Sequence, residues 1–408
     1  MRIAAALVNL VPYHHARWDA VSNLDGFQVD VIEITNRDAF SVLEHRGCGS
    51  YTRHTMFPGV QPEEVALSDL RSELGLRLGA IVPEVVFASG WSLRIGIEVI
   101  SWAVSNRVPF VMLSESNSFD RKRSMFKEYL KRRAVLLASA GFVGGSSHAS
   151  YLRELGMHPD RISLGHNAVD NQHFRSLASA SPTDKHSEIP SPPAFPRYFL
   201  ACSRFSEKKN IPFLIRAFAR YRELDSEGSG KSETSRRTPW KLRIVGGGDQ
   251  LPAIEETVRS LGLDDSVHLD GSVGYAELPR FYAHAGAFVH ASTTEQWGLV
   301  VNEAMASGLP VLVSDRCGCA PDLVDEGVNG WTFDPLDVDG LAELMLRIAG
   351  MPEGERLALG EASQAIIAHW GPERFASGLK AAAEKALEIG PKRGRWLDRC
   401  LLGLLARR

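Results

Sequence analysis

Short apolar runs that end in turn residues alternate with amphipathic stretches along most of this chain. Each run is long enough for one strand, and each stretch between runs is long enough for a helix. The runs form two series, IAAALVNL, VDVIEI, EVVFASG, VPFVMLS and GFVGGSS, then YFLACSRF, KLRIVGGG, SVHLDGSV, AFVHAS and LPVLVSD. This alternation is typical of βαβ units on a parallel sheet. The sequence therefore predicts an α/β fold with two doubly wound, Rossmann-like domains.

A tract rich in Ser, Pro and Ala, SLASASPTDKHSEIPSPPAFP, separates the two series and has no apolar periodicity. We expect an N-terminal domain over 1–175, a linker over 176–196 and a C-terminal domain over 197–370. The remaining 371–408 are expected to form helices that cross back to the first domain. Ligands of open α/β sheets bind outside the carboxyl ends of the strands. We therefore expect two domains that face each other across a cleft, with functional residues in their strand-to-helix turns.

Composition narrows the classes of function. The 408 residues contain 46 Lys+Arg and 49 Asp+Glu, a formal net charge of −3, whereas a dedicated nucleic-acid binder carries a positive excess. Only Cys317 and Cys319 are close together among the five cysteines, so we expect neither a disulfide framework nor a zinc site. No apolar run reaches the roughly 18 residues of a membrane span. We expect a cytoplasmic protein with no metal, no cofactor and no nucleic-acid partner.

The densest candidate site is the segment from Ala291 to Val324. Glu295 lies in the turn before a predicted helix that begins near Gly298, and Glu303 lies about one turn inside it. Backbone amides at a helix start attract anions, whereas the two carboxylates repel them. A nucleotide sugar resolves this conflict, since amides hold its phosphates and carboxylates accept its hydroxyl hydrogens. The alternative is that both acids are ordinary helix and surface residues.

Two further strand-to-helix turns have the chemistry of a phosphate site. Arg204 follows one strand, and Lys208 and Lys209 come shortly after it, just before the next helix. Cations at that position suit a pyrophosphate that gains charge as it leaves. The strand KLRIV ends in Gly246–Gly248, which allows close approach of a ligand to the backbone. A solvated basic turn and a plain tight turn remain the alternatives.

The motifs SRFSEKKN, VGGG, SVGYAELPRFYAHA and EQWGLVVNEAMASGLPVLVS, in this order, resemble the retaining family 4 glycosyltransferases, also described as glycosyl transferases group 1, which have the GT-B fold. The resemblance covers nearly all of the second half of the chain. In the first half it covers mainly GGSSHASYLRELGMHPDRISLGHNAVD. One departure is Trp297, where many members have Phe.

The resemblance implies roles for individual residues. Arg204 and Lys209 would bind the donor diphosphate, and Glu295 would hold hydroxyls of the transferred sugar; these three are our catalytic candidates. The ribose hydroxyls would be accepted by Glu303. The complete set of expected donor-binding residues is Gly247, Gly248, Gly298, Leu299, Val300 and Glu303. The implied chemistry retains the anomeric configuration without an enzyme nucleophile, and because no Asp-x-Asp motif is evident, side-chain cations would replace a divalent metal.

The first half departs from the family pattern on the acceptor side. The turn NLVPYHHARWD lacks the expected glycine pair, and Glu115 stands in the region where members often have a histidine. His14 and Glu115 are therefore our acceptor-side candidates. A surface histidine and a helix N-cap are the alternative interpretations of these two residues.

A basic amphipathic stretch with aromatic residues runs from Arg121 to Arg133 and is typical of interfacial membrane contact, with a solvated face as the alternative. The tail PKRGRWLDRCLLGLLARR is expected either to pack on the first domain or to touch lipid. We expect a hexosyltransferase that acts on a glycan or lipid-linked acceptor in polysaccharide or glycolipid assembly, peripheral on the inner membrane face. A non-catalytic nucleotide-sugar or glycan-binding protein and a GT-B nucleotide-sugar epimerase are the alternatives.

Overall fold

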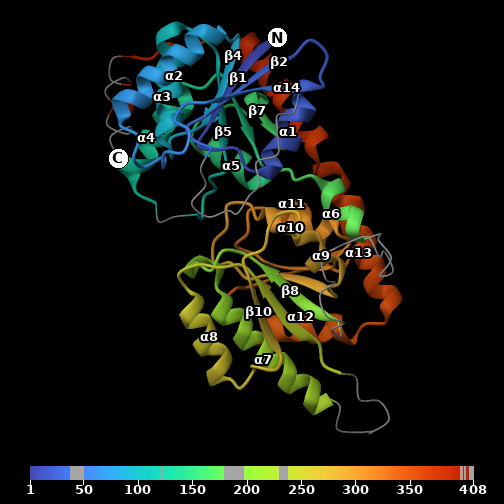
Figure 1. The fold of residues 1–408 in the computed structure, drawn as a ribbon. Coiled ribbons are helices and arrows are strands. Elements are labelled where there is room, and N and C mark those ends of the chain that lie inside the picture. Colours follow the sequence, from blue (N-terminus) through green and yellow to red (C-terminus); the bar gives the residue numbers. More distant parts are fainter. Residues whose placement is uncertain are drawn as a thin grey trace. The chain divides into compact units, whose positions relative to one another are not determined.

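The computed structural model describes residues 1–36, 50–120, 123–178, 197–228, 238–395, 398 and 401–403. The chain divides into two units, the first formed by Met1–Asp170 with Trp370–Arg408 and the second by Asn171–His369. Each unit is built on one parallel sheet with helices on both faces (Figure 1). In the described part of the chain, no helix is long and apolar enough to span a bilayer.

The first unit contains seven parallel strands in the order β3-β2-β1-β4-β5-β6-β7. Their bounds are β1 Arg2–Leu7, β2 Gln28–Glu33, β3 Thr52–Thr55, β4 Val85–Ser89, β5 Phe110–Ser114, β6 Ala140–Val143 and β7 Ile162–Leu164. The chain builds outward from β1 in one direction and then from β4 in the other. The strand order therefore reverses between β1 and β4, where ligands commonly bind in such sheets.

Helices cover both faces of this first sheet. The helices are α1 Pro12–Ser22, α2 Leu67–Ile81, α3 Arg94–Asn106, α4 Met125–Leu136, α5 Ser146–Glu154 and α14 Pro372–Ile389, with a short 3-10 turn, η1, at Pro159–Arg161. Along β1, Ala4 and Ala6 belong to the core formed with α2, α3 and α4, whereas Ile3 and Ala5 belong to the core formed with α1 and α14. Both faces of β1 are thus buried, which explains its continuous apolar run.

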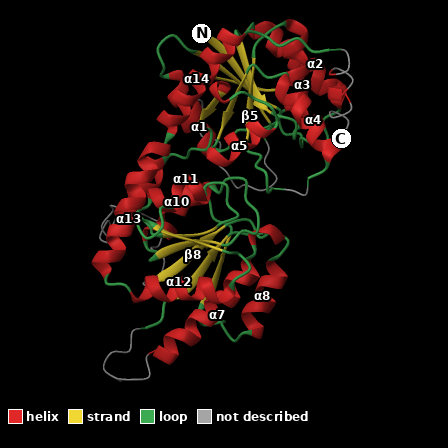
Figure 2. Ribbon diagram, turned by 180° about the vertical axis from the view of Figure 1, so that it is seen from behind, coloured by secondary structure: helices red, strands yellow, loops and turns green. Residues whose placement is uncertain are grey.

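The second unit contains six parallel strands in the order β10-β9-β8-β11-β12-β13. Their bounds are β8 Tyr198–Cys202, β9 Lys241–Val245, β10 Val267–Gly271, β11 Ala287–His290, β12 Val311–Ser314 and β13 Gly330–Phe333. Its helices are α6 Asn171–Ala178, α7 Ile211–Gly228, α8 Leu251–Ser260, α9 Leu278–Ala283, α10 Leu299–Ala306, α11 Ala320–Leu323, α12 Val338–Gly350 and α13 Glu353–Ile367, with 3-10 turns η2 Glu207–Lys209 and η4 Ala368–Trp370. Figure 2 shows α7, α8 and α12 beside the sheet of this unit. One buried core joins these three helices to the sheet.

The two parallel sheets confirm the predicted α/β class. The expected domain boundary at 175/176 lies inside α6, which belongs to the second unit, so that unit begins at Asn171. The expected linker, 176–196, starts within this helix, and its residues 179–196 lie outside the described residues. The segment from Trp370 onward belongs to the first unit.

Helix α14 is held to the first unit by aromatic packing. Phe375 is 1% exposed, and its ring centroid lies 5.4 Å from that of Trp18 and 5.2 Å from that of Phe142. We predict that Phe375→Ala lowers the free energy of unfolding by about 3–5 kcal/mol, because it removes a buried ring and leaves a cavity. Urea denaturation measures this loss.

The matched control is Leu387→Ala on the same helix, since the Leu387 side chain is 40% exposed. We expect this control to change stability by less than about 1 kcal/mol. Equal losses in the two variants would show that α14 is not anchored through Phe375.

Candidate functional site

The loops after β8 and β9 approach each other so closely that glycine is required. Gly246 has φ 144°, and a Cβ there would lie 1.8 Å from the carbonyl oxygen of Ser203. Gly248 has φ 152°, and a Cβ there would lie 2.6 Å from the carbonyl oxygen of Phe205. A side chain at either position would collide with backbone. The glycines therefore serve the packing of these two loops, and for Gly247 and Gly248 donor contact stays a prediction.

Glu295, on the loop after β11, is the centre of a buried charged cluster. Its carboxylate forms an ion pair with Lys209 and lies 3.5 Å from Lys208 Nζ and 3.6 Å from His290 Nε2. Glu295 is 9% exposed, and burial alone would raise its pKa. The bond to His290 and the two lysine charges outweigh burial and hold this pKa well below its usual value. Glu295 is thus an anion that faces cations from another loop.

The two lysines are placed by a tight turn after β8. They lie in η2, and the following Asn210 adopts the left-handed conformation with φ 56°. Asn210 Nδ2 donates a hydrogen bond of 2.9 Å to the carbonyl of Pro335, which ties this turn to the loop after β13. Arg204 is exposed on the same connection, between β8 and η2. The structure therefore brings Lys209 and Glu295 into contact, with Arg204 on the loop that carries the lysines.

The start of α10 adjoins Glu295. Gly298 is the N-cap residue with φ 105°, and a Cβ there would lie 3.6 Å from Glu295 Cγ. The side chain of Trp297 is 2% exposed, and its Nε1 donates to Asn302 Oδ1 at 2.9 Å, which fixes the turn to the helix. The first amides of a helix, here those of Leu299 and Val300, have no intrahelical acceptor. An anion at this helix start would meet these amides close to the lysine cluster.

Glu303 lies on α10 as predicted, but it is buried rather than solvated. It is 6% exposed, and Tyr282 Oη on α9 donates a hydrogen bond of 2.8 Å to its Oε2. Burial raises the pKa of Glu303 to about 7, which the Tyr282 bond only partly offsets. Sequence reasoning did not single out Tyr282, although it lies within the motif FYAHA. The interpretation of Glu303 as an ordinary surface acid is therefore wrong.

The acceptor-side candidates come together in the first unit. Glu115 directly follows β5, and its Oε1 lies 3.4 Å from Nδ1 of His166, which follows β7. The first turn of α1 contains His14, whose pKa is lowered by burial, then by the nearby charges of Arg17 and His166. The pKa of Glu115 falls to about 2, because the His166 bond and the Arg17 charge outweigh burial. The segments that follow β1, β5 and β7 therefore contribute to one polar cluster. We call it the histidine–glutamate cluster; its members are His14, Arg17, Glu115 and His166.

Arg17 is a member of this cluster that sequence reasoning missed. It is 2% exposed, and its Nε donates a hydrogen bond of 2.7 Å to the carbonyl of Ala168. The sequence of α1, PYHHARWDAVS, has no distinct apolar face, so it gave no signal that Arg17 is buried. The helix N-cap interpretation of Glu115 is wrong, because the next helix, α4, begins only at Met125. Among the described residues, no group of three or more His, Cys, Asp or Glu side chains is arranged to hold a metal ion.

Comparison with known proteins identifies similar sequences for the second half of the chain. Residues 183–365 match the family model described as glycosyl transferases group 1. D-inositol 3-phosphate glycosyltransferase of Thermobifida fusca is 32% identical over 198 residues, which cover 46% of this chain and 42% of that protein. A GDP-mannose-dependent alpha-(1-6)-phosphatidylinositol monomannoside mannosyltransferase of Mycolicibacterium smegmatis is 29% identical over 201 residues, 47% of this chain and 48% of that protein. The match therefore spans less than half the length of these two relatives.

Solved structures share the fold over nearly the whole chain. Sucrose-phosphate synthase from Thermosynechococcus elongatus is 18% identical and superposes with a TM-score of 0.67 over 93% of this chain and 97% of its own. The Anabaena protein HepE in complex with UDP-glucose is 16% identical, with a TM-score of 0.68 over 93% of this chain and 98% of its own. These likenesses confirm the predicted GT-B fold.

The raised pKa of Glu303 predicts how stability depends on pH. The folded carboxyl titrates near 7 instead of at its ordinary 4.5, so between these values the folded state binds more protons than the unfolded state. The free energy of unfolding therefore falls as pH rises through this window. Glu303→Gln removes the fall, so we expect the variant to be more stable than the native protein at pH 8 by roughly 3 kcal/mol, and similar to it near pH 4.5. Thermal denaturation between pH 4.5 and 8.5 measures the difference.

Glu255→Gln on α8 is the control, since Glu255 is exposed. We expect it to follow the native protein at every pH. A Glu303→Gln variant that is less stable than the native protein at pH 8 would contradict the buried-carboxyl account.

Proposed function

Because residues 183–365 match the glycosyl transferases group 1 model and the chain shares its fold with solved glycosyltransferases, we propose that this protein is a retaining glycosyltransferase that uses a nucleotide-diphosphate hexose. The acceptor is a glycan or lipid-linked sugar in polysaccharide or glycolipid assembly. The observation that carries this proposal is the cluster of Lys208, Lys209 and Glu295 beside the start of α10. At this place the lysine cations and the first amides of α10 can bind phosphate oxygens, and the Glu295 carboxylate can accept hydrogen bonds from sugar hydroxyls. A sugar diphosphate needs both kinds of contact.

Donor binding follows from the charges of this site. Arg204 and Lys209 neutralise the diphosphate, and the amides of Leu299 and Val300 bind its oxygens. Before the donor arrives, Glu295 balances the charge of Lys209. The ribose hydroxyls donate to Glu303, which Tyr282 orients through its hydrogen bond. The HepE structure with UDP-glucose supports a nucleotide-sugar donor for the shared fold.

The same groups account for catalysis of transfer. As the bond between the sugar and the diphosphate breaks, negative charge grows on the leaving oxygen, and fixed cations stabilise this charge more than they stabilise the bound donor. Glu295 holds sugar hydroxyls and is not the nucleophile, because a carboxylate with a strongly lowered pKa that faces two lysines is a weak base. Side-chain cations supply the neutralisation, so we propose that no divalent ion is required.

The acceptor binds in the first unit at the histidine–glutamate cluster. With its pKa near 2, Glu115 is ionised at any physiological pH and accepts hydroxyl hydrogens from a sugar. His14, neutral because its pKa is lowered, offers one ring nitrogen as a donor or acceptor. For a lipid-linked acceptor we propose that the protein works at the anionic inner face of the cell membrane.

The proposal predicts product with the donor's anomeric configuration. Purified protein is incubated with UDP-, GDP-, ADP- and dTDP-hexoses and candidate glycan acceptors; release of the nucleoside diphosphate is followed, and the new linkage is assigned by NMR. One nucleotide class should support transfer, and the rate should persist in excess chelator. Arg204→Ala and Lys209→Ala should each lower kcat by about a hundredfold to a thousandfold, because each variant loses a cation that stabilises the negative charge on the leaving diphosphate.

Arg216→Ala on α7 is the matched control. Arg216 is exposed and does not lie on the loops after β8, β9 and β11 that form the site, so this variant should leave kcat unchanged. Donor binding without turnover would favour a non-catalytic nucleotide-sugar-binding protein. A donor sugar converted to its epimer would favour an epimerase. Inverted product, or loss of activity on chelation, would contradict retention or metal independence respectively.

A further inference from the structure

Helix α4 of the first unit exposes large apolar side chains on its outer face. Met125, Tyr129, Arg132 and Leu136 have the spacing i, i+4, i+7 and i+11, which places them along one side of the helix. Phe126, exposed beside Met125 in the first turn, extends this surface, and we call the five residues the outer stripe. The apolar side chains of this region are exposed as follows: Phe119 38%, Met125 93%, Phe126 60%, Tyr129 52% and Leu136 39%. Four of these side chains lie on α4 itself, and several exposed large apolar side chains on one helix mark an interaction surface.

The fold does not need this outer stripe. The inner face of α4 already has its own apolar residues, Leu130, Ala134 and Val135, which are at most 4% exposed, and Ala134 and Val135 belong to the core that also contains α2 and α3. The helix therefore has two apolar faces, of which one packs on the sheet. The other lies toward solvent.

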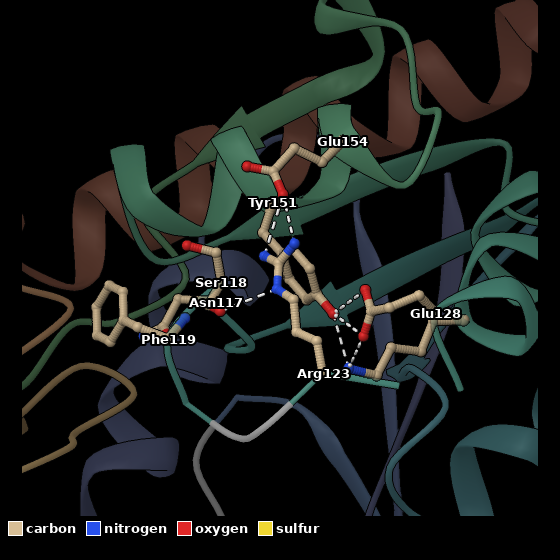
Figure 3. Close-up of polar contacts among 8 residues, drawn as sticks. Asn117, Ser118, Phe119, Arg123, Glu128, Tyr151 and Glu154 are labelled. Carbon is tan, nitrogen blue, oxygen red and sulfur yellow. Dashed lines mark hydrogen bonds and ion pairs between the residues drawn. The ribbon is translucent and has the colours of Figure 1, made fainter. Parts of the chain in front are cut away.

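Polar contacts connect the start of α4 to α5 (Figure 3). Tyr151 Oη donates to Glu128 at 2.8 Å, and Lys131 Nζ donates to the same carboxylate at 2.9 Å. Arg123 bonds Glu154 at 3.1 Å, and its guanidinium lies 4.9 Å from the centroid of the Tyr151 ring. These contacts fix the orientation of the helix, so the stripe is presented by a supported element. They also show that Arg123 and Lys131 have structural partners.

The C-terminal segment adjoins the same helix. Arg133 of α4 donates from Nε to Asp398 Oδ1 at 2.8 Å, and Asp398 is 3% exposed. Leu402 is buried in the core that contains Ala134 and Val135. Asp398 and Leu402 of the tail therefore pack on the first unit. The sequence pattern grouped Arg133 with the surface cations, but Arg133 binds Asp398 of the C-terminal segment.

Charge distinguishes this region from the rest of the chain. Residues 119–136 contain seven Lys+Arg against two Asp+Glu, and residues 391–403 contain four against one, in a chain whose net charge is −3. Arg132 is exposed within the stripe itself, and Arg393 and Arg395 are exposed in the adjoining segment. In an anionic phospholipid bilayer, negatively charged headgroups lie above apolar acyl chains. A protein surface with apolar side chains among cations is complementary to such a bilayer.

We propose that the outer stripe of α4, together with the adjoining basic segment 391–395, docks on an anionic phospholipid bilayer. Met125, Phe126 and Tyr129 enter the interface between headgroups and acyl chains, and Arg132 meets the phosphates. This inference deepens the proposed membrane location by naming the residues that make the contact. It does not depend on the donor site, which lies in the other unit.

The test is sedimentation of the full chain with vesicles of phosphatidylglycerol and phosphatidylcholine, without nucleotide sugar. Phe126→Ser should lower the partition coefficient about tenfold or more, because a large apolar side chain no longer leaves water. Arg132→Gln should lower it about fivefold, as expected for one cation at an anionic surface. Vesicles of phosphatidylcholine alone should bind the native protein much more weakly, and salt should release it from the anionic vesicles.

Matched controls lie elsewhere in the same unit. Leu76→Ser on α2 changes an apolar side chain that is 67% exposed, and Lys380→Gln on α14 changes a cation that is 45% exposed; both should bind vesicles like the native protein. Thermal denaturation of each variant checks that folding is intact. Absent binding, equal binding to neutral vesicles, or equal losses in stripe and control variants would each overturn the proposal. So would a dimer in sedimentation velocity that Phe126→Ser abolishes without any vesicle binding, because the stripe would then join two copies.

Discussion

The buried ion pair between Lys209 and Glu295 joins two loops of the second unit that are far apart in the sequence. A carboxylate that is 9% exposed is costly unless cations and hydrogen bonds balance it. The balance comes from residues far apart in the sequence, so the turn after β8 and the loop after β11 must meet. Several local features serve that meeting: the left-handed Asn210, the glycine at the start of α10, and the bond from the Gly318 amide to the Glu295 carbonyl at 3.0 Å.

The two units have one architecture but surround a glutamate with different charges. Both place polar side chains after parallel strands, where loops converge at one edge of the sheet. In the second unit the partners of the central carboxylate are lysines, which suit a diphosphate. In the first unit the partners of Glu115 are His166 and Arg17, and the cluster suits hydroxyl recognition. The charges around Glu295 and around Glu115 are therefore the basis for the ligand proposed in each unit.

Much of this arrangement could be predicted from the sequence, because it depends on local order. The alternation of strands and helices fixes which residues follow a strand. This placed Lys209, Glu295, His14 and Glu115 in loops or at helix starts, and Glu303 about one turn inside a helix. Long-range contacts could not be predicted in the same way. The burial of Arg17, the Tyr282 hydrogen bond to Glu303 and the Arg133 bond to Asp398 depend on how helices pack. The boundary inside α6 was missed for the same reason, since helix packing assigns α6 to the second unit.

The central claim is that Lys209 exchanges its contact with Glu295 for a donor diphosphate. Calorimetric titration with UDP, GDP, ADP and dTDP tests it most directly, because binding of the free nucleotide needs no acceptor and no membrane. The account predicts that one of these nucleotides binds and that Lys209→Ala weakens its affinity by about tenfold or more, as expected for loss of a charged hydrogen-bond donor. Failure of every nucleotide to bind, or equal affinity in the native and Lys209→Ala proteins, would contradict the account.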